Sequence, residues 1–488
     1  MSVPVINHPR RKGIAVILTT LSMFVIVPMV GLGIDVSTLY IVRAKLYEAA
    51  DAAALAGARA LSQGSDSNTQ KANAQTVATR YFNANFPASF WGATNITLST
   101  PTIDDATVPN YRTVSITASV QAPLYFLRIL GQTTSTIAVS TQAARRDALV
   151  MLVLDRSSSM NYAFQGSTAC AILKPDAVQF LNNFAPGRDM VGLVVFGSTA
   201  YVAAPRLNFD QPDANGNTVA SLINQISCGG NTNTTEAMQQ AYAQVQAINS
   251  TSRANVIVLM TDGRPNAFTG NYTNLRTSPG SCDPGNAPLI GTLAQWAGGP
   301  NPTGTTAGLM NYSTNSITNA NEGPTAYSGG CNFAGDLTKA RNDLSGMPPA
   351  DIYGNATAGP YSTYNPNFPY NGAYANLTGV SSPQMIEVAS TNVLDNEGTK
   401  IRTDATLKPA IYTIALEGNS PGDPPDTLIL RKLANDPSME NDPDATARTF
   451  YQQQKAQPQG YFADAPDPSQ LFAAFNTIAT QIVIRLSR

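Results

Sequence analysis

The first feature of the hydropathy pattern is an uninterrupted apolar segment near the start of the chain. Residues 13–34 carry no charged side chain. A helix over these 22 residues is about 33 Å long, which matches a hydrocarbon core of about 30 Å. The pattern therefore predicts a transmembrane helix. Pro28 lies inside it, and a membrane helix tolerates such a proline with a kink.

The charges that flank this segment predict its orientation. Arg10, Arg11 and Lys12 precede it and Asp35 follows it, and the positive-inside rule keeps the basic side in the cytoplasm. We expect residues 1–12 to be a cytoplasmic tail and the body of the chain to be exported. A cleaved signal peptide is the alternative. The segment is longer than a typical h-region of about 7 to 15 residues, however, and no small-x-small cleavage site follows it closely.

Periodic patterns continue beyond the apolar segment. Small and apolar residues recur at spacings of three and four between Leu39 and Ala60, which predicts an amphipathic helix with an alanine-rich face. This face packs either on pilin-like subunits or on the small domain of the helix itself. Residues 111–120 and 137–139 show the alternation of strands. Residues 35–146 are thus predicted to form a small α+β module.

Continuous apolar runs mark a second, larger domain. The runs at 148–154 and 256–260 are typical of strands buried on both faces of a sheet. Amphipathic segments alternate with further strand-like runs, which predicts an α/β, doubly wound, mostly parallel sheet of Rossmann-like type over residues 147–488. The other expected helices and strands lie within 170–184, 189–202, 219–226, 235–248, 385–403, 410–418 and 460–488.

A long polar insertion interrupts this domain. Residues 266–382 are rich in Asn, Thr, Gly, Pro and Tyr and show little helical periodicity, and they are too many for an ordinary loop. Their tyrosines argue against disorder. Because the insertion follows the second apolar run, we expect it beside the carboxyl edge of the sheet, either as a lid or contact surface or as an irregular decoration.

Composition excludes several classes of function. The net charge is −2 and only 13% of residues are charged, so the chain lacks the basic field of nucleic-acid-binding proteins. Its single histidine, His8, lies in the N-terminal tail. The body therefore offers neither a Ser-His-Asp triad nor a histidine-bound zinc site. A length of 488 residues allows two or three domains.

Four cysteines follow the apolar segment, namely Cys170, Cys228, Cys282 and Cys331. An even number without a Cys-x-x-Cys pair fits two disulfides in an oxidising compartment. Of the three pairings, we favour Cys170–Cys228 with Cys282–Cys331. The alternative is four reduced, buried thiols.

Oxygen-bearing side chains follow the two apolar runs. Asp155, Ser157 and Ser159 form an Asp-x-Ser-x-Ser array after the first run, Asp262 follows the second, and Thr232 lies in a glycine-rich loop that opens a helix. In open α/β sheets, ligands bind at the carboxyl ends of strands. Carboxylate and hydroxyl oxygens suit a hard cation. The sequence therefore predicts a site for a divalent cation, Mg²⁺ first, with Mn²⁺ or Ca²⁺ as alternatives.

The residues of these segments, and the order of the segments, resemble the von Willebrand factor A (vWA) family with its metal-ion-dependent adhesion site (MIDAS). The resemblance implies that Ser157, Ser159 and Thr232 supply hydroxyl ligands, Thr232 directly or through water. It also implies that Asp155 and Asp262 act mainly through coordinated water. The open sixth position implies a protein partner that offers an acidic residue to the metal. A vWA fold that keeps these residues but holds no functional metal is the alternative.

The N-terminal part resembles TadE/TadG-like proteins of the Flp (tight adherence) pilus-assembly system. The resemblance rests on residues 10–61 and 121–145, and residues 461–479 resemble the C-terminus of TadG. Pilin-like prepilins carry a glutamate five residues after the processing glycine, whereas IAVIL follows Gly13. This departure favours a permanent anchor. The resemblance implies a single-pass protein of the bacterial inner membrane, with the body in the periplasm or at the cell surface.

These observations predict a Tad/Flp pilus-assembly or adhesion protein that binds partners, pilus or pilin-like subunits among them, through a divalent cation. A general surface adhesin or matrix-binding module unconnected with pili is the alternative. We do not expect an enzyme. Asp155 resembles the nucleophile of haloacid dehalogenase-type phosphotransferases, but Ser157 stands where those enzymes have a second aspartate.

Overall fold

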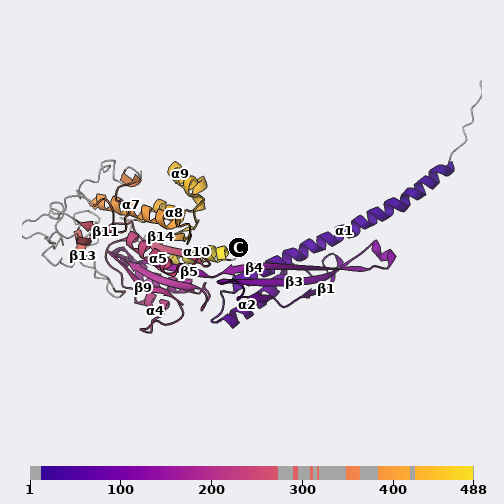
Figure 1. Ribbon diagram of the computed structural model, residues 1–488, viewed down its shortest axis with the longest axis horizontal. Helices are drawn as coiled ribbons and strands as arrows, with labels where there is room; N and C mark the ends of the chain where they lie inside the picture. Colours follow the sequence, from indigo (N-terminus) through magenta and orange to yellow (C-terminus); the bar gives the residue numbers. More distant parts are fainter. Residues whose placement is uncertain are drawn as a thin grey trace, which may run out of the picture. The chain divides into compact units, whose positions relative to one another are not determined.

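The structure is a computed structural model, and it describes residues 12–272, 289–294, 308–311, 316–317, 348–362, 383–417 and 424–486. The chain divides into two compact units (Figure 1). Among the described residues, unit 1 takes those up to Leu61 and Asn68–Arg145, and unit 2 takes Ser62–Ser67 and Arg146–Leu486. Each unit has its own hydrophobic core.

A single long helix begins unit 1. Helix α1 runs over Lys12–Ala60, which is 49 residues, and contains Pro28. The apolar side chains between Val16 and Ile34 are exposed, and exposed apolar surface of this extent marks an interaction with a membrane or another protein. Among the described residues, α1 is the one helix long and apolar enough to cross a membrane. The predicted span and the predicted alanine-rich helix are thus one continuous helix.

The C-terminal half of α1 packs on a sheet within unit 1. Strand β3 (Tyr111–Pro123) pairs with β1 (Thr94–Leu98), β2 (Thr102–Asp104) and β4 (Thr134–Arg146). Alternate residues of β3 are buried, as the pattern of residues 111–120 predicts. Several alanines of α1 lie in the same core, namely Ala49, Ala50, Ala53, Ala54 and Ala58. Of the two alternatives for the alanine-rich face, the structure shows packing on its own module.

A second helix and two short turns complete unit 1. Helix α2 (Ser67–Asn85) buries Ala74, Ala78 and Phe82. The sequence analysis did not predict α2, because most of its residues are polar and two of its buried side chains, Ala74 and Ala78, are small. The 3-10 turns are η1 (Phe90–Gly92) and η2 (Leu127–Leu130).

A six-stranded sheet forms the centre of unit 2. The strand order is β15-β14-β10-β5-β8-β9. All neighbouring pairs are parallel except β8 with β9, which confirms the predicted doubly wound, mostly parallel sheet. The strands are β5 (Ala148–Asp155), β8 (Met190–Phe196), β9 (Ala200–Leu207), β10 (Ala254–Thr261), β14 (Ala410–Leu416) and β15 (Phe462–Ala465).

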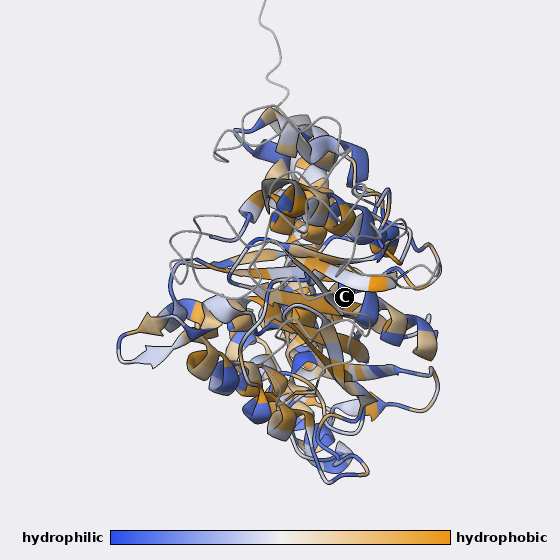
Figure 2. Cartoon of the chain, turned by 90° about the vertical axis from the view of Figure 1, so that its left-hand side faces the viewer, coloured by the Kyte–Doolittle hydropathy of each residue, from blue (hydrophilic) through white to orange (hydrophobic). Residues whose placement is uncertain are grey.

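Helices cover both faces of this sheet, whose strands are largely apolar (Figure 2). Even-numbered residues of β5 from Val150 to Leu154 lie in one core and odd-numbered residues from Leu149 to Val153 lie in another, because successive strand residues face opposite sides. The first core includes α3 (Ala169–Leu181), α4 (Val219–Gln225) and α10 (Leu471–Leu486). The second includes α5 (Thr234–Ile248), α7 (Pro383–Arg402) and α8 (Thr427–Ala434).

The described part of the insertion adds a small antiparallel sheet with the order β11-β12-β13. Its strands are β11 (Ala267–Tyr272), β12 (Leu289–Ala294) and β13 (Gly308–Asn311). Cys282 and Cys331 lie outside the described residues, so their pairing stays a prediction. The smaller elements of unit 2 are β6 (Ala163–Phe164), β7 (Ser167–Thr168), α9 (Ala445–Gln454), η3 (Ser158–Asn161), η4 (Pro360–Ser362), η5 (Pro437–Asn441) and η6 (Pro468–Gln470).

Candidate metal site

Two aspartates lie together because the strands before them are neighbours. Strands β5 and β10 are parallel, and Leu154 pairs with Met260, so their carboxyl ends coincide. Asp155 is the last residue of β5, and Asp262 follows the last residue of β10. The Thr261 hydroxyl donates to Asp155 Oδ2 at 2.5 Å, which ties the two strand ends to each other.

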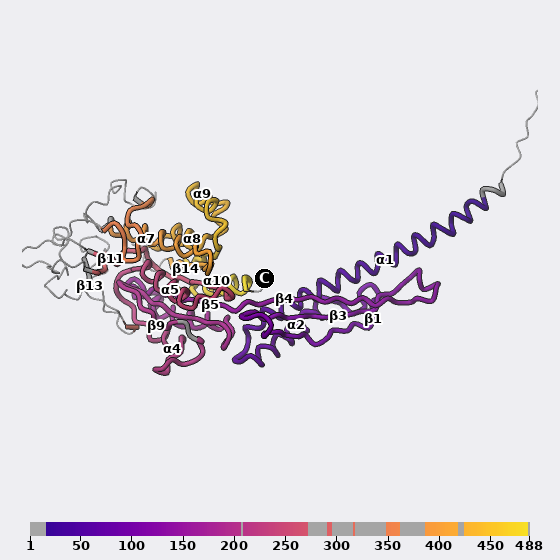
Figure 3. The backbone as a smooth tube through the Cα atoms, viewed as in Figure 1, coloured from indigo at the N-terminus to yellow at the C-terminus, as the bar shows by residue number. Residues whose placement is uncertain are grey.

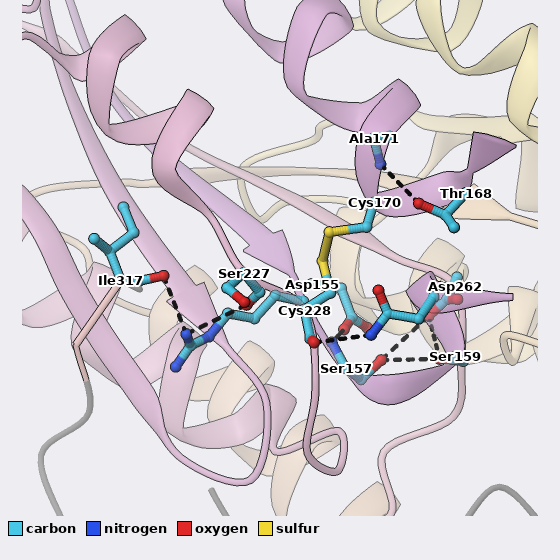
Figure 4. The surroundings of a disulfide bond; sticks show 12 residues. Asp155, Ser157, Ser159, Thr168, Cys170, Ala171, Ser227, Cys228, Asp262 and Ile317 are labelled. Atoms are coloured by element: carbon cyan, nitrogen blue, oxygen red, sulfur yellow. Dashed lines mark hydrogen bonds between the residues drawn. A yellow bond between two sulfur atoms is a disulfide. The ribbon is translucent and has the colours of Figure 1, made fainter. Parts of the chain in front are cut away.

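The two serines of the array converge on the second aspartate (Figure 4). Ser159 Oγ donates to Asp262 Oδ1 at 2.7 Å, and Ser157 Oγ donates to the same oxygen at 3.3 Å. The two hydroxyl oxygens are 2.9 Å apart. The Ser157 N–H donates to Asp155 Oδ1 at 2.7 Å, which fixes the turn after β5. The structure thus brings four of the five predicted ligands into one cluster.

Most of the cluster is buried, and Ser159 is its most exposed member. Asp155 and Asp262 have no exposed surface, whereas Ser159 is partly exposed. Burial raises the pKa of Asp155, and hydrogen bonds from Thr261 and Ser157 oppose the rise only in part. A cation nearby would favour the ionised form of such a carboxylate.

The fifth predicted ligand, Thr232, is bound through its backbone to the loop that follows β10. Its N–H donates to Asn266 Oδ1 at 2.7 Å, and its carbonyl accepts from the Asn266 N–H at 3.1 Å. Asn266 follows Asp262 by four residues, so the loop after β10 holds the loop of Thr232. The sequence analysis did not identify Asn266, and only its place shortly after an apolar run could have drawn attention to it.

A disulfide and three hydrogen bonds position the glycine-rich loop. Cys228 in this loop is bonded to Cys170 in α3, which confirms that predicted pair (Figure 4). The Ser158 N–H donates to the Gly230 carbonyl at 2.9 Å, and the Gly229 N–H donates to the Arg156 carbonyl at 2.6 Å. Asn161 Nδ2 donates to the Cys228 carbonyl at 2.8 Å. The loops of Asp155 and Thr232 are therefore bound to each other.

A buried polar network supports the start of α5, directly after Thr232. Asn233 is the N-cap of α5 and donates from Nδ2 to Glu236 Oε2 at 2.9 Å. The Thr269 hydroxyl donates to the same Glu236 oxygen at 2.7 Å. The spacing of Asn233 and Glu236 is that of a capping box, and this signal could have predicted where α5 begins. The network joins α5 to β11 of the insertion.

Arg156 links the site to a second part of the insertion. Its side chain is fully buried, although it follows Asp155 in an otherwise polar turn. Arg156 Nη1 donates to the carbonyls of Ser316 and Ile317 at 3.1 and 3.4 Å. Sequence reasoning missed this residue, because an arginine in a polar turn gives no sign that it is buried.

The donors of the cluster fit a hard divalent cation. Two carboxylates and two hydroxyls provide only oxygen, the element that Mg²⁺ and Ca²⁺ prefer. In the described part of the chain, no group of three or more His, Cys, Asp or Glu residues is placed to hold a metal. A metal at this cluster would therefore depend on hydroxyl ligands as well as on carboxylates.

Two family models match the chain. The one described as von Willebrand factor type A domain matches residues 150–264. The one described as putative Flp pilus-assembly TadE/G-like matches residues 13–60. A search of curated proteins finds no match.

Several solved structures are similar to the chain at low identity. The PilB minor pilin from Streptococcus sanguinis is 14% identical, with 82% of this chain and 80% of that chain covered and a TM-score of 0.37. The vWF domain of the type V pili tip protein Mfa5 from Porphyromonas gingivalis is 15% identical, with 70% and 97% covered and a TM-score of 0.33. At these TM-scores the likeness carries no conclusion about function. The family matches carry the assignment: the chain combines a TadE/G-like segment with a von Willebrand factor type A domain.

Proposed function

We propose that this chain is a membrane-anchored Tad/Flp pilus-assembly or adhesion protein that binds partner proteins through a divalent cation. The observation that carries the proposal is the convergence of Asp155, Ser157, Ser159 and Asp262 at the carboxyl edge of the sheet. This edge is where ligands bind in open α/β sheets. The TadE/G-like match of residues 13–60 supports a place in pilus assembly.

Five residues would hold the cation: Asp155, Ser157, Ser159, Thr232 and Asp262. Mg²⁺ is the expected metal, with Mn²⁺ and Ca²⁺ as alternatives. When bound, the cation supplies a Lewis-acidic position that accepts a carboxylate oxygen from a partner. The partial exposure of Ser159 supports the idea that this position faces the solvent. The expected partner therefore presents an Asp or Glu side chain, and pilus or pilin-like subunits are the first candidates.

Helix α1 would anchor this site outside the cytoplasm. Its apolar side chains between Val16 and Ile34 are exposed, and basic residues precede the apolar span. The positive-inside rule then puts the vWA domain in the periplasm or at the cell surface. The disulfide between Cys170 and Cys228 supports an oxidising compartment. A segment matched to pilus assembly and a vWA domain together support a non-enzymatic role.

Titration calorimetry with Mg²⁺ and Mn²⁺ on the full chain in detergent micelles tests the metal site. We expect binding by the wild type and none by Asp155→Ala, which removes a carboxylate from the centre of the cluster. Ser158→Ala is the matched control, because the side chain of Ser158 is exposed and lies in the same turn. This control should bind like the wild type. Thermal melting of both variants checks that each remains folded.

Two results would contradict the proposal. One is a folded wild-type protein that takes up neither of these ions nor Ca²⁺. The other is an Asp155→Ala variant that binds the metal as tightly as the wild type. Chemical crosslinking in membranes then separates the pilus role from a general adhesin, since only the former predicts EDTA-sensitive crosslinks to pilus subunits.

A further inference from the structure

The tip of the β3–β4 hairpin in unit 1 carries exposed apolar side chains. Ile129 is 79% exposed and Leu130 is 73% exposed, and both belong to the turn η2. Tyr125 and Arg128 beside them are also exposed. The hairpin points toward the N-terminal end of α1 (Figure 3). Exposed aliphatic residues grouped in this way mark an interaction site.

Hydrogen bonds hold this tip against α1 where the apolar span ends. Asp35 Oδ1 accepts from the Tyr125 N–H at 2.6 Å, and Oδ2 accepts from the Leu127 N–H at 2.8 Å. The Phe126 N–H lies 3.1 Å from both oxygens. Asp35 is only 1% exposed and is the first residue after the span at residues 13–34. The tip therefore lies at the level of the predicted membrane boundary.

One side chain of the hairpin packs on the apolar span itself. A Cβ atom added to Gly31 would lie 2.1 Å from Phe126 Cδ2, so the aromatic ring fills the space beside this glycine. Gly31 precedes Asp35 by four residues, or about 6 Å along the helix. The hairpin thus reaches below the boundary that Asp35 marks.

The turn η1 adds an interfacial aromatic residue at the same end of unit 1. Trp91, one of two tryptophans in the chain, is 52% exposed. A Cβ added to the neighbouring Gly92 would lie 3.2 Å from Pro123 and 3.5 Å from Tyr125 Oη, so η1 lies beside the base of the tip. Trp and Tyr concentrate where a membrane meets water.

We propose that this end of unit 1 inserts into the extracytoplasmic leaflet of the bilayer that α1 spans. The inserting residues, here named the tip surface, are Trp91, Tyr125, Arg128, Ile129 and Leu130. The two aliphatic residues enter the acyl boundary, the two aromatic residues lie among the headgroups, and Arg128 faces lipid phosphates. The inference rests on the membrane-anchor part of the proposed function and adds a second membrane contact to it.

Two features favour lipid over a second protein as the occupant. The tip surface lies at the depth where Leu32 and Ile34 of α1 are exposed as well, so both apolar surfaces meet the same medium. It also combines the aliphatic, aromatic and basic side chains that a membrane interface takes. Bonding of Asp35 to the hairpin would then fix the orientation of unit 1 on the membrane.

Tryptophan fluorescence of the full chain tests the inference in vesicles of phosphatidylethanolamine and phosphatidylglycerol with brominated acyl chains. Trp91→Phe and Trp296→Phe first remove the native signals. Leu130→Trp then reports the tip surface, and Phe24→Trp reports the apolar span. Val108→Trp is the matched control, because Val108 is an exposed apolar residue that precedes β3, at the end opposite the tip.

We expect Leu130→Trp and Phe24→Trp to emit at shorter wavelength and to lose most of their emission to the brominated lipid. Val108→Trp should emit as in water and stay unquenched. Quenching of Phe24→Trp without quenching of Leu130→Trp would overturn the tip inference and leave the anchor intact. If neither is quenched, the anchor itself fails. A blue-shifted Leu130→Trp that lipid does not quench, with crosslinks between chains, would assign the surface to a second copy instead.

Discussion

Two buried aspartates, Asp35 and Asp155, have pKa values that shift in opposite directions. Asp35 accepts hydrogen bonds from three consecutive backbone N–H groups. Burial acts to raise its pKa, but these donors outweigh it and the pKa is lowered. Asp155 is also buried, and there burial prevails and the pKa is raised, because its donors only partly compensate. The first carboxylate is stabilised as an anion by the fold, and the second is not.

The difference lies in the donors. Backbone N–H groups can only donate, and the turn after β3 fixes their direction toward Asp35, so this contact is complete without a ligand. The hydroxyls of Ser157 and Ser159 now donate to Asp262, but a hydroxyl can turn and offer its lone pairs instead. The cluster around Asp155 can therefore accept a cation without rebuilding its backbone.

The largest expected effect is on stability with and without Mg²⁺. A ligand that binds only the folded state stabilises it by about 2.7 kcal/mol when its free concentration is a hundred times Kd. We expect Mg²⁺ to raise the free energy of unfolding of unit 2 by about this amount in the wild type. Asp262→Asn should lose this gain and Asp35→Asn should keep it. Denaturant unfolding in Mg²⁺ and in EDTA measures this gain for each variant. An equal gain in the two variants would contradict the idea that only the Asp155 cluster takes a cation.

A smaller effect is expected from two glycines of the apolar span. Gly31→Ala forces a Cβ into the Phe126 ring, whereas no atom lies within 4 Å of a Cβ at Gly33. Overpacking of this kind costs about 1 to 3 kcal/mol. The amides of residues 125–127 should then exchange with deuterium about 5- to 150-fold faster in Gly31→Ala. Gly33→Ala should exchange like the wild type, and similar exchange in both variants would show that Phe126 does not hold the hairpin.

The sequence predicted the clustering of Asp155 and Asp262 better than the hairpin contact for a physical reason. Asp155 and Asp262 each follow an apolar run, and parallel strands bring their carboxyl ends together whatever the details of packing. Local pattern was therefore enough to predict that these side chains lie together, and their role as metal ligands stays a prediction. The same pattern indicated only that Asp35 ends an apolar span. Its hydrogen-bond partners lie 90 or more residues away in the sequence. The hydropathy pattern does not predict contacts between residues so far apart.

The residues that sequence reasoning missed share this dependence on distant contacts. Arg156 is buried because carbonyls about 160 residues away accept its hydrogen bonds. Asn266 matters because its side chain meets the backbone of Thr232. Helix α2 was missed for another reason: its buried face includes two alanines, which give a weak hydropathy signal. Packing against α1 and β3, rather than its own pattern, selects the helix.

The smallest expected effect concerns pH at the hairpin contact. Because the pKa of Asp35 is lower in the folded state, its ionised form stabilises docking above its ordinary value of about 4. That contribution is lost as pH falls through the folded pKa. Lipid quenching of the Leu130→Trp probe should therefore stay constant from neutral pH down to about pH 4 and decline below it. Asp35→Asn should quench less than the wild type above about pH 4 and lack this transition. A transition that persists in Asp35→Asn would have to come from a group other than this carboxylate.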